Sequence, residues 1–135
     1  MILLALLAAG PIAVEFDALD QAMATCARNV VNPAFAADAG RRSRLVTETL
    51  RAQEAIVTER LDIADRRRAL RENRPTGIRA NDTDQILAMA ALALEDRQRA
   101  LDDRRLLETM RTEAMDVKRR YYLAHCAKRT NNAQN

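Results

Sequence analysis

The segment Asn73-Arg74-Pro75-Thr76-Gly77 decides the fold, because it is the strongest turn signal between two long helical patterns. A Pro disfavours helical geometry in the residue before it, and a Gly is common where a helix ends. Apolar residues recur every seven positions on both sides of this turn, which is typical of long helices. The sequence therefore predicts an all-α fold, a long antiparallel helical hairpin that is coiled-coil-like, with its tip over residues 73–81.

The two arms of the predicted hairpin each carry two adjacent apolar rows. We expect the first arm over residues 38–72, and its rows are Thr49, Ile56, Ile63, Leu70 and Leu50, Val57, Ala64. We expect the second arm over residues 82–127, after the N-cap candidates Asn81 to Asp84. Its rows are Ile86, Ala93, Ala100, Leu107, Ala114, Tyr121 and Leu87, Leu94, Leu101, Met115, Tyr122. Because adjacent rows lie about 100° apart, we expect each pair to form one continuous stripe facing the other arm.

The register of the arms predicts a disulfide. In an antiparallel pair of helices, the numbers of two facing residues add up to a constant. Matching the apolar rows of the two arms gives a sum of about 150. A register shifted by one heptad, with a sum of about 157, is left open. The first register places Cys26 and Cys126 at the same level of the hairpin, although they were not used to find it. A bridge closing so long a loop stabilises a fold by up to ~4–5 kcal/mol in the chain-entropy model. Free thiols are the alternative, whereas a metal site is disfavoured because these two cysteines and His125 are too few for closed zinc coordination.

A short first helix is expected over residues 15–31, with its apolar side chains on one face. Asn32-Pro33 is expected to end it, since a residue before Pro is pushed out of helical geometry. We expect this helix to pack at the base of the hairpin, which gives a single helical domain over residues 14–129. The polar residues 130–135 are expected to be a disordered tail.

Residues 1–13 form an apolar segment that resembles the core of a secretory signal peptide. The segment is too short to span a bilayer as a helix. It lacks the usual basic start, because Arg28 is the first basic residue. We expect an exported protein of the periplasm or cell envelope. An uncleaved membrane tether and a buried cytosolic segment are the alternatives.

The composition argues against catalysis. The chain has one His and three isolated Gly, which exclude both a two-His metal helix and a glycine-rich phosphate loop. Its carboxylates mostly have an Arg three or four residues away, as solvated helix faces do. We therefore expect no enzymatic activity, no cofactor, no metal site and no small-molecule substrate.

Basic residues gather near the tip, and they are candidate contacts for an acidic partner. The cluster consists of Arg66, Arg67, Arg68, Arg71, Arg74 and Arg79. It could bind acidic lipid headgroups, lipopolysaccharide phosphates or an acidic protein surface. A separate basic row of Arg97, Arg104, Arg111 and Lys118 could follow nucleic-acid phosphates, but it lacks interleaved aromatic residues. We interpret that row as a solvated helix face.

These features favour a non-enzymatic scaffold or adaptor of the cell envelope that acts by protein–protein interaction or self-association. In outline, an exported helical hairpin with a basic tip resembles the long-armed periplasmic holdase chaperones. That resemblance is one of architecture alone, and fold does not carry function. A holdase chaperone is therefore one alternative, and a basic nucleic-acid-binding helical protein is another.

Overall fold

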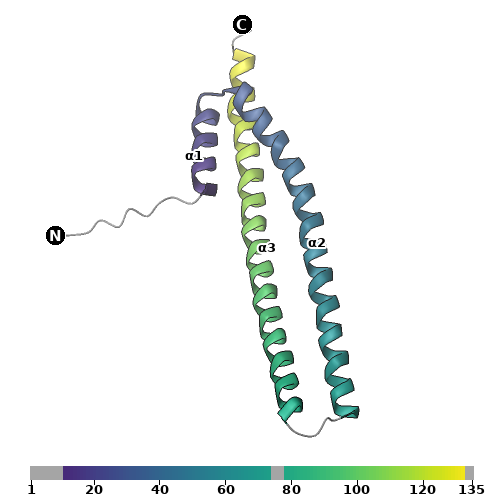
Figure 1. Cartoon of the computed structure of the whole chain (residues 1–135). Coiled ribbons are helices and arrows are strands. Elements are labelled where there is room, and N and C mark those ends of the chain that lie inside the picture. Colours follow the sequence, from purple (N-terminus) through teal and green to yellow (C-terminus); the bar gives the residue numbers. More distant parts are fainter. Residues whose placement is uncertain (1–10, 74–77, 133–135) are drawn as a thin grey trace, which may run out of the picture. The chain divides into compact units, whose positions relative to one another are not determined.

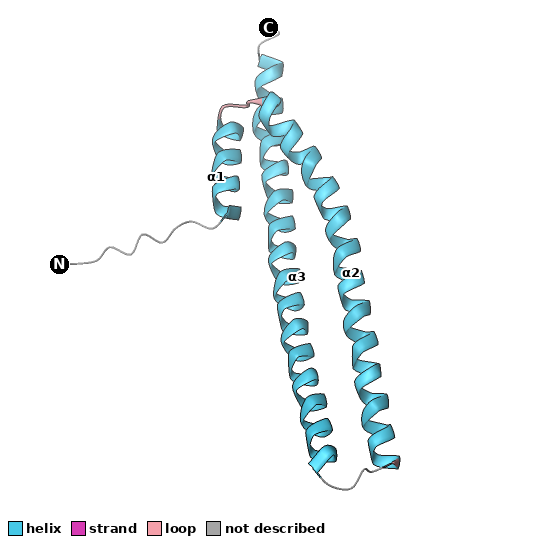
Figure 2. Cartoon of the chain, viewed as in Figure 1, coloured by secondary structure: helices cyan, strands magenta, loops and turns pink. Residues whose placement is uncertain are grey.

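A computed structural model describes residues 11–73 and 78–132. All of the regular secondary structure within these ranges is α-helical. The helices are α1 (Pro11–Ala24), α2 (Arg28–Glu72) and α3 (Ile78–Asn132). In each part of the chain where both are present, helices α2 and α3 run antiparallel and pack against each other, and the short α1 packs beside the end of α3 (Figures 1 and 2). The predicted all-α hairpin with a short first helix is therefore confirmed. Residues 1–10 of the signal-like segment, residues 74–77 of the predicted tip and residues 133–135 of the tail lie outside the described residues.

The chain divides into two compact units where a single domain was expected. The three-helix unit consists of residues 1–42 and 111–135, so it contains α1, the start of α2 and the end of α3. The two-helix unit consists of residues 43–110 and contains the remaining lengths of α2 and α3. Each unit has its own hydrophobic cluster.

The predicted boundary between the first two helices is wrong. Helix α1 ends at Ala24, and α2 already begins at Arg28. The turn between them is a Schellman motif, in which Ala27 N–H donates to Ala22 C=O (2.9 Å) and Cys26 N–H donates to Met23 C=O (3.1 Å). Cys26 takes the left-handed conformation that this motif requires, with φ of 53°.

Helix α2 continues through Pro33, which was expected to end the first helix. A Pro inside a helix leaves one carbonyl without its usual amide partner, and it costs about 3 kcal/mol in a helix interior. Val31 and Phe35, on either side of Pro33, are both buried in the core of the three-helix unit. Packing of these two side chains offsets the cost, so tertiary contacts override the local signal.

Helix α3 is longer at both ends than predicted, because it begins at Ile78 and runs to Asn132. The expected N-cap residues, Asn81 to Asp84, therefore lie inside the helix and do not cap it. Acidic side chains in the first turns of a helix still complement its dipole, which explains why they mimic a start signal. Residues 130–132, expected to be disordered, are the last residues of α3.

Each long helix buries one of its two apolar rows, and the expectation that both rows face the partner helix is wrong. On α3 the buried row contains Leu87, Leu94, Leu101, Met115 and Tyr122. The adjacent row is exposed, as at Ile86, Leu107 and Tyr121. On α2, Ile56 is buried and Ile63 is half-buried, whereas Leu50 and Val57 are exposed. A stripe about 100° wide is broader than the contact that one neighbouring helix makes.

The two units differ in the amount of core that they contain. The cluster of the three-helix unit comprises Leu19, Met23, Val31, Phe35, Met115, Tyr122 and Cys126. The rings of Phe35 and Tyr122 meet edge to face with centroids 6.0 Å apart. The cluster of the two-helix unit comprises only Ile56, Leu94 and Leu101, with Ala52 and Ile63 packed against it. Large apolar side chains of the two-helix unit therefore remain in solvent.

Candidate interaction surface

Among the described side chains of the two-helix unit, ten large apolar ones are 43% to 67% exposed. Four lie on α2 and form what we name the α2 row, which consists of Val46, Leu50, Val57 and Leu61. Four lie on α3 and form the α3 row, which consists of Met89, Leu92, Leu107 and Met110. Ile86 and Leu106 are the other two. Single exposed apolar residues are ordinary, but ordered rows of them mark binding surfaces.

Each row occupies one face of its helix. At 100° per residue, the α3 row falls within about 60° and points about 180° away from Leu87, Leu94 and Leu101. The α2 row also falls within about 60°, and it lies beside the buried face that contains Ile56. The α2 row is nearly continuous along its helix. The α3 row consists of two apolar pairs, Met89 with Leu92 and Leu107 with Met110, and Asp96 and Asp103 lie on the same face between them.

Polar pairs between α2 and α3 favour the rotation of the two helices that leaves the α2 row and the α3 row exposed. Gln53 and Gln98 exchange two amide hydrogen bonds, of 3.0 and 3.1 Å. Arg97 pairs with Glu59 (2.5 Å), and this hydrogen bond raises the pKa of the Arg97 guanidinium. A rotation of α3 that buried its exposed row would break these pairs. Polar pairs at a helix seam are a known means of fixing register.

Each member of the basic row on α3 pairs with a carboxylate, and the members differ in exposure. Arg97 and Arg104 are about half exposed, as a solvated face would be, whereas Arg111 is buried and Lys118 is half-buried. In the two-helix unit Arg97 meets Glu59, and Arg104 meets Glu48 at 3.0 Å. In the three-helix unit Arg111 meets Glu15, and Lys118 meets Asp20, both on α1. All four cations contact carboxylates of a neighbouring helix. The seven-residue spacing of the row therefore reflects packing of α3 against α1 and α2.

A buried charge cluster, which no local sequence pattern indicates, lies in the three-helix unit. Asp38 is 3% exposed, and its carboxylate accepts hydrogen bonds from Arg41 (3.2 Å) and Arg42 (2.6 Å). Arg111 is 8% exposed, with its Nε atom 4.0 Å from the Asp38 carboxylate, and two of its nitrogens donate to Glu15. The cluster thus ties α1, α2 and α3 together.

Arg42, at the edge of this cluster, forms a further ion pair with a carboxylate of α3. Arg42 donates to Asp116 (3.0 Å), and this hydrogen bond raises the pKa of Arg42. The same bond holds the pKa of Asp116 below its ordinary value. The Arg42 guanidinium also donates to the carbonyl of Thr112 at 3.4 Å. Charge pairs in this unit therefore favour one docking of its helices.

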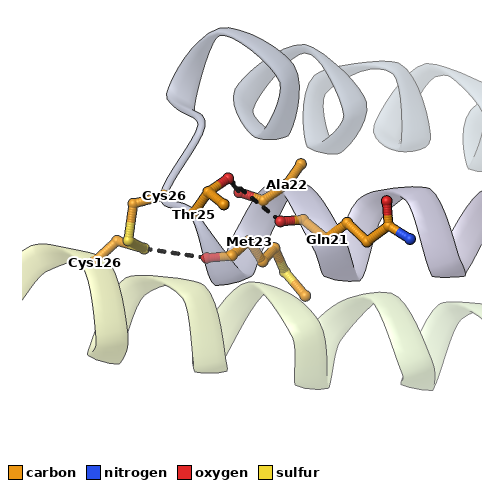
Figure 3. The surroundings of a disulfide bond; sticks show 6 residues. All are labelled: Gln21, Ala22, Met23, Thr25, Cys26 and Cys126. Atoms are coloured by element: carbon orange, nitrogen blue, oxygen red, sulfur yellow. Dashed lines mark hydrogen bonds between the residues drawn. A yellow bond between two sulfur atoms is a disulfide. The ribbon is translucent and has the colours of Figure 1, made fainter.

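Cys26 and Cys126 are brought together in the three-helix unit, as the register predicted. The structure joins them in a disulfide with Cα atoms 5.7 Å apart (Figure 3). The Cys126 sulfur also lies 3.6 Å from the carbonyl oxygen of Met23. A disulfide sulfur has no hydrogen to donate, so this approach is a packing contact. The bridge joins the turn after α1 to the last part of α3.

The basic residues predicted near the tip are only partly paired. Arg66 meets Asp62 (2.9 Å) and Arg68 meets Asp65 (3.5 Å), both as exposed pairs along α2. Such pairs contribute little to stability. Arg67 is exposed and remains open to an acidic partner.

The other members of that cluster are differently placed. Arg71 is exposed in the last turn of α2. Arg74 lies outside the described residues. Arg79 lies in the first turn of α3, and its side chain is outside what the structure describes.

Among the described residues, no three His, Cys, Asp or Glu side chains are grouped so that they could hold a metal ion. None of the described helices is long and apolar enough to cross a membrane. Comparison with known proteins gives no match to a protein family, to a curated protein or to a solved structure.

Proposed function

We propose that this chain is a non-enzymatic protein of the cell envelope that acts by binding proteins along the two-helix unit. The observation that carries the proposal is the pair of apolar rows on α2 and α3, which their own packing leaves exposed. A partner helix that covered them would gain about 25 cal/mol per Å² of apolar surface removed from water. Such recognition of a helix by a helical groove or face needs no catalytic residue.

Two features support the envelope as the site of action. The apolar segment 1–13 is typical of a signal-peptide core. The disulfide of Cys26 and Cys126 fits an oxidising compartment, because such bridges are rare in the cytosol of most organisms. Export and oxidation can be tested together by the intact mass of protein taken from its source cells after thiol blocking. We expect a chain without blocked thiols and without its first residues, and an intact Met1 with two blocked thiols would contradict export.

Photo-cross-linking in the source cells tests the binding surface. A photoreactive amino acid in place of exposed Leu50 should give cross-links to protein, because Leu50 belongs to the α2 row. The matched control is the neighbouring Arg51, which is exposed and points about 100° away. Equal cross-linking from both positions, or none from Leu50, would contradict binding through this row.

A holdase chaperone is the second candidate, because exposed Leu and Met side chains also suit the capture of unfolded chains. A holdase should suppress aggregation of a denatured client at a stoichiometric ratio. Replacing Leu50 and Leu61 with Gln should then reduce that suppression while leaving helicity unchanged. An adaptor with one folded partner should show no suppression with or without the replacements.

A further inference from the structure

The residues of the α3 row are arranged symmetrically along the sequence, and the packing of α3 on α2 does not require this arrangement. Its side chains are Met89, Leu92, Leu107 and Met110, each between 56% and 66% exposed. Their positions mirror each other about the point between Arg99 and Ala100, and so do their types, with Met outermost and Leu inside. Asp96 and Asp103 continue the mirror pattern toward the centre.

A helix that pairs antiparallel with its own copy has this pattern. In an interface with two-fold symmetry, residue i contacts j and residue j contacts i. An axis between Arg99 and Ala100 would place Leu92 against the second copy's Leu107, and Met89 against its Met110. We propose that a second copy of this chain docks antiparallel on the α3 row, with the two-fold axis at Arg99 and Ala100. This inference rests on the proposed function: it names a second copy as the partner of the α3 row and leaves the α2 row for other proteins.

Charge supports the same arrangement. Within its own chain the exposed Arg99 reaches only Glu95 (3.7 Å) and Asp96 (3.4 Å), as weak surface pairs. In the antiparallel pair, each Arg99 would lie one helical turn from the second copy's Asp96 and Asp103. The two guanidiniums would supply opposite charge between acids that face each other. A shifted register would separate these charges and also misalign Leu92 and Leu107.

The exposed apolar area is close to what a standard dimer interface buries. The transfer free energy of one methylene group corresponds to ~32 Å² of apolar surface. Multiplying this area by the number of side-chain heavy atoms and by the exposed fraction of each residue gives roughly 400 Å² of exposed apolar side chain per copy for the α3 row together with Leu106. A standard interface buries about 800 Å² per partner, of which about 57%, or roughly 450 Å², is apolar. The opposite face of α3 packs on α2, so the α3 row is open to a second copy.

Sedimentation equilibrium of the full oxidised chain tests the dimer. We expect a monomer–dimer equilibrium whose dissociation constant rises at least tenfold in the variant Leu92→Gln with Leu107→Gln. The matched control is Val46→Gln with Leu61→Gln on the α2 row, which should leave the dissociation constant within about twofold. Circular dichroism checks that both variants keep their helicity, since Gln is a good helix former. A monomer at all concentrations, or equal weakening by both variants, would overturn the inference.

Cross-linking through introduced cysteines tests the position of the axis. Ala100 and Ala93 are both exposed and lie seven residues apart on α3. Ala100→Cys should form an intermolecular disulfide on mild oxidation, because the axis brings the two copies of this position together. Ala93→Cys should not, because its copies would be about 20 Å apart along the axis. Cross-linking of both at similar rates indicates a parallel pair and refutes the proposal. If the chain is monomeric but Leu50 still cross-links other proteins in cells, this inference fails and the proposed function stands.

Discussion

Cys26 shows why the end of the first helix was not predicted from the local sequence. Its φ of 53° closes the Schellman turn after α1, at the position that Gly usually occupies in this motif. Left-handed geometry costs a residue with a Cβ atom about 1–2 kcal/mol. The disulfide to Cys126 holds the residue in this turn, so the usual glycine signal is absent.

The strain at Cys26 can be measured by comparing two substitutions. In a Cys126→Ser background, Cys26→Gly should be more stable than Cys26→Ala by about 1 kcal/mol, because Gly adopts positive φ without the Cβ penalty. Urea unfolding followed by circular dichroism gives both free energies. Equal stabilities, or a more stable Ala variant, would mean that the turn relaxes once the bridge is gone.

Asp38 is the carboxylate on which the buried charge cluster depends. Asp38→Ala should lower the free energy of unfolding by about 3–5 kcal/mol, because it leaves the buried Arg111 and the half-buried Arg42 without their shared acid. The control Asp62→Ala removes only an exposed pair with Arg66 and should cost less than about 0.5 kcal/mol. Chemical denaturation measures both changes. A loss below 1 kcal/mol at Asp38 would show that the cluster does not hold the three helices.

The cysteine pairing could be predicted from sequence, but the cluster around Asp38 could not. The register of the two arms, found from the sum of residue numbers, places the two cysteines at the same level of the hairpin. Asp38 and Arg42 instead follow the i, i+4 spacing of countless solvated pairs. Only the packing of α1 and α3 on α2 distinguishes this pair from exposed ones such as Asp62 and Arg66.

At the level of helices, the sequence predicts that two long arms exist but does not show which face each arm buries. The rows through Leu94 and Ile86 are both apolar, and periodicity ranks them equally. The polar pairs at Gln53–Gln98 and Arg97–Glu59 favour the face that contains Leu94. These pairs join residues about 40 positions apart, so no local pattern reveals them.

Helix α2 should become more stable without Pro33. Pro33→Ala restores a donor to the carbonyl of Asn29, and we expect the free energy of unfolding to rise by about 1–2 kcal/mol. The increase is smaller than the full interior cost because Pro also restricts the unfolded chain. Thermal and urea unfolding measure the change, with Ala36→Pro as the converse control that should destabilise the fold. No gain from Pro33→Ala would mean that the helix bends at Pro33 to recover the lost bond.

At the level of the whole molecule, the features that stabilise the fold and the surface that we propose for binding lie in different units. The three-helix unit contains the larger core, the disulfide and the buried charges. Among its described side chains, the two-helix unit contains four buried large apolar residues and ten exposed ones. A unit with few buried contacts opens locally at low free-energy cost, and it gains stability from whatever covers it.

Hydrogen exchange of the full oxidised chain at two protein concentrations tests this division most directly. We predict that amides of residues 83–110 exchange faster than those of residues 111–126 in dilute protein, and that their protection rises at the higher concentration as the α3 row is covered. Protection of the three-helix unit should not change with concentration. Equal protection of both units at both concentrations would contradict the claim that the exposed rows of the two-helix unit are its binding surface.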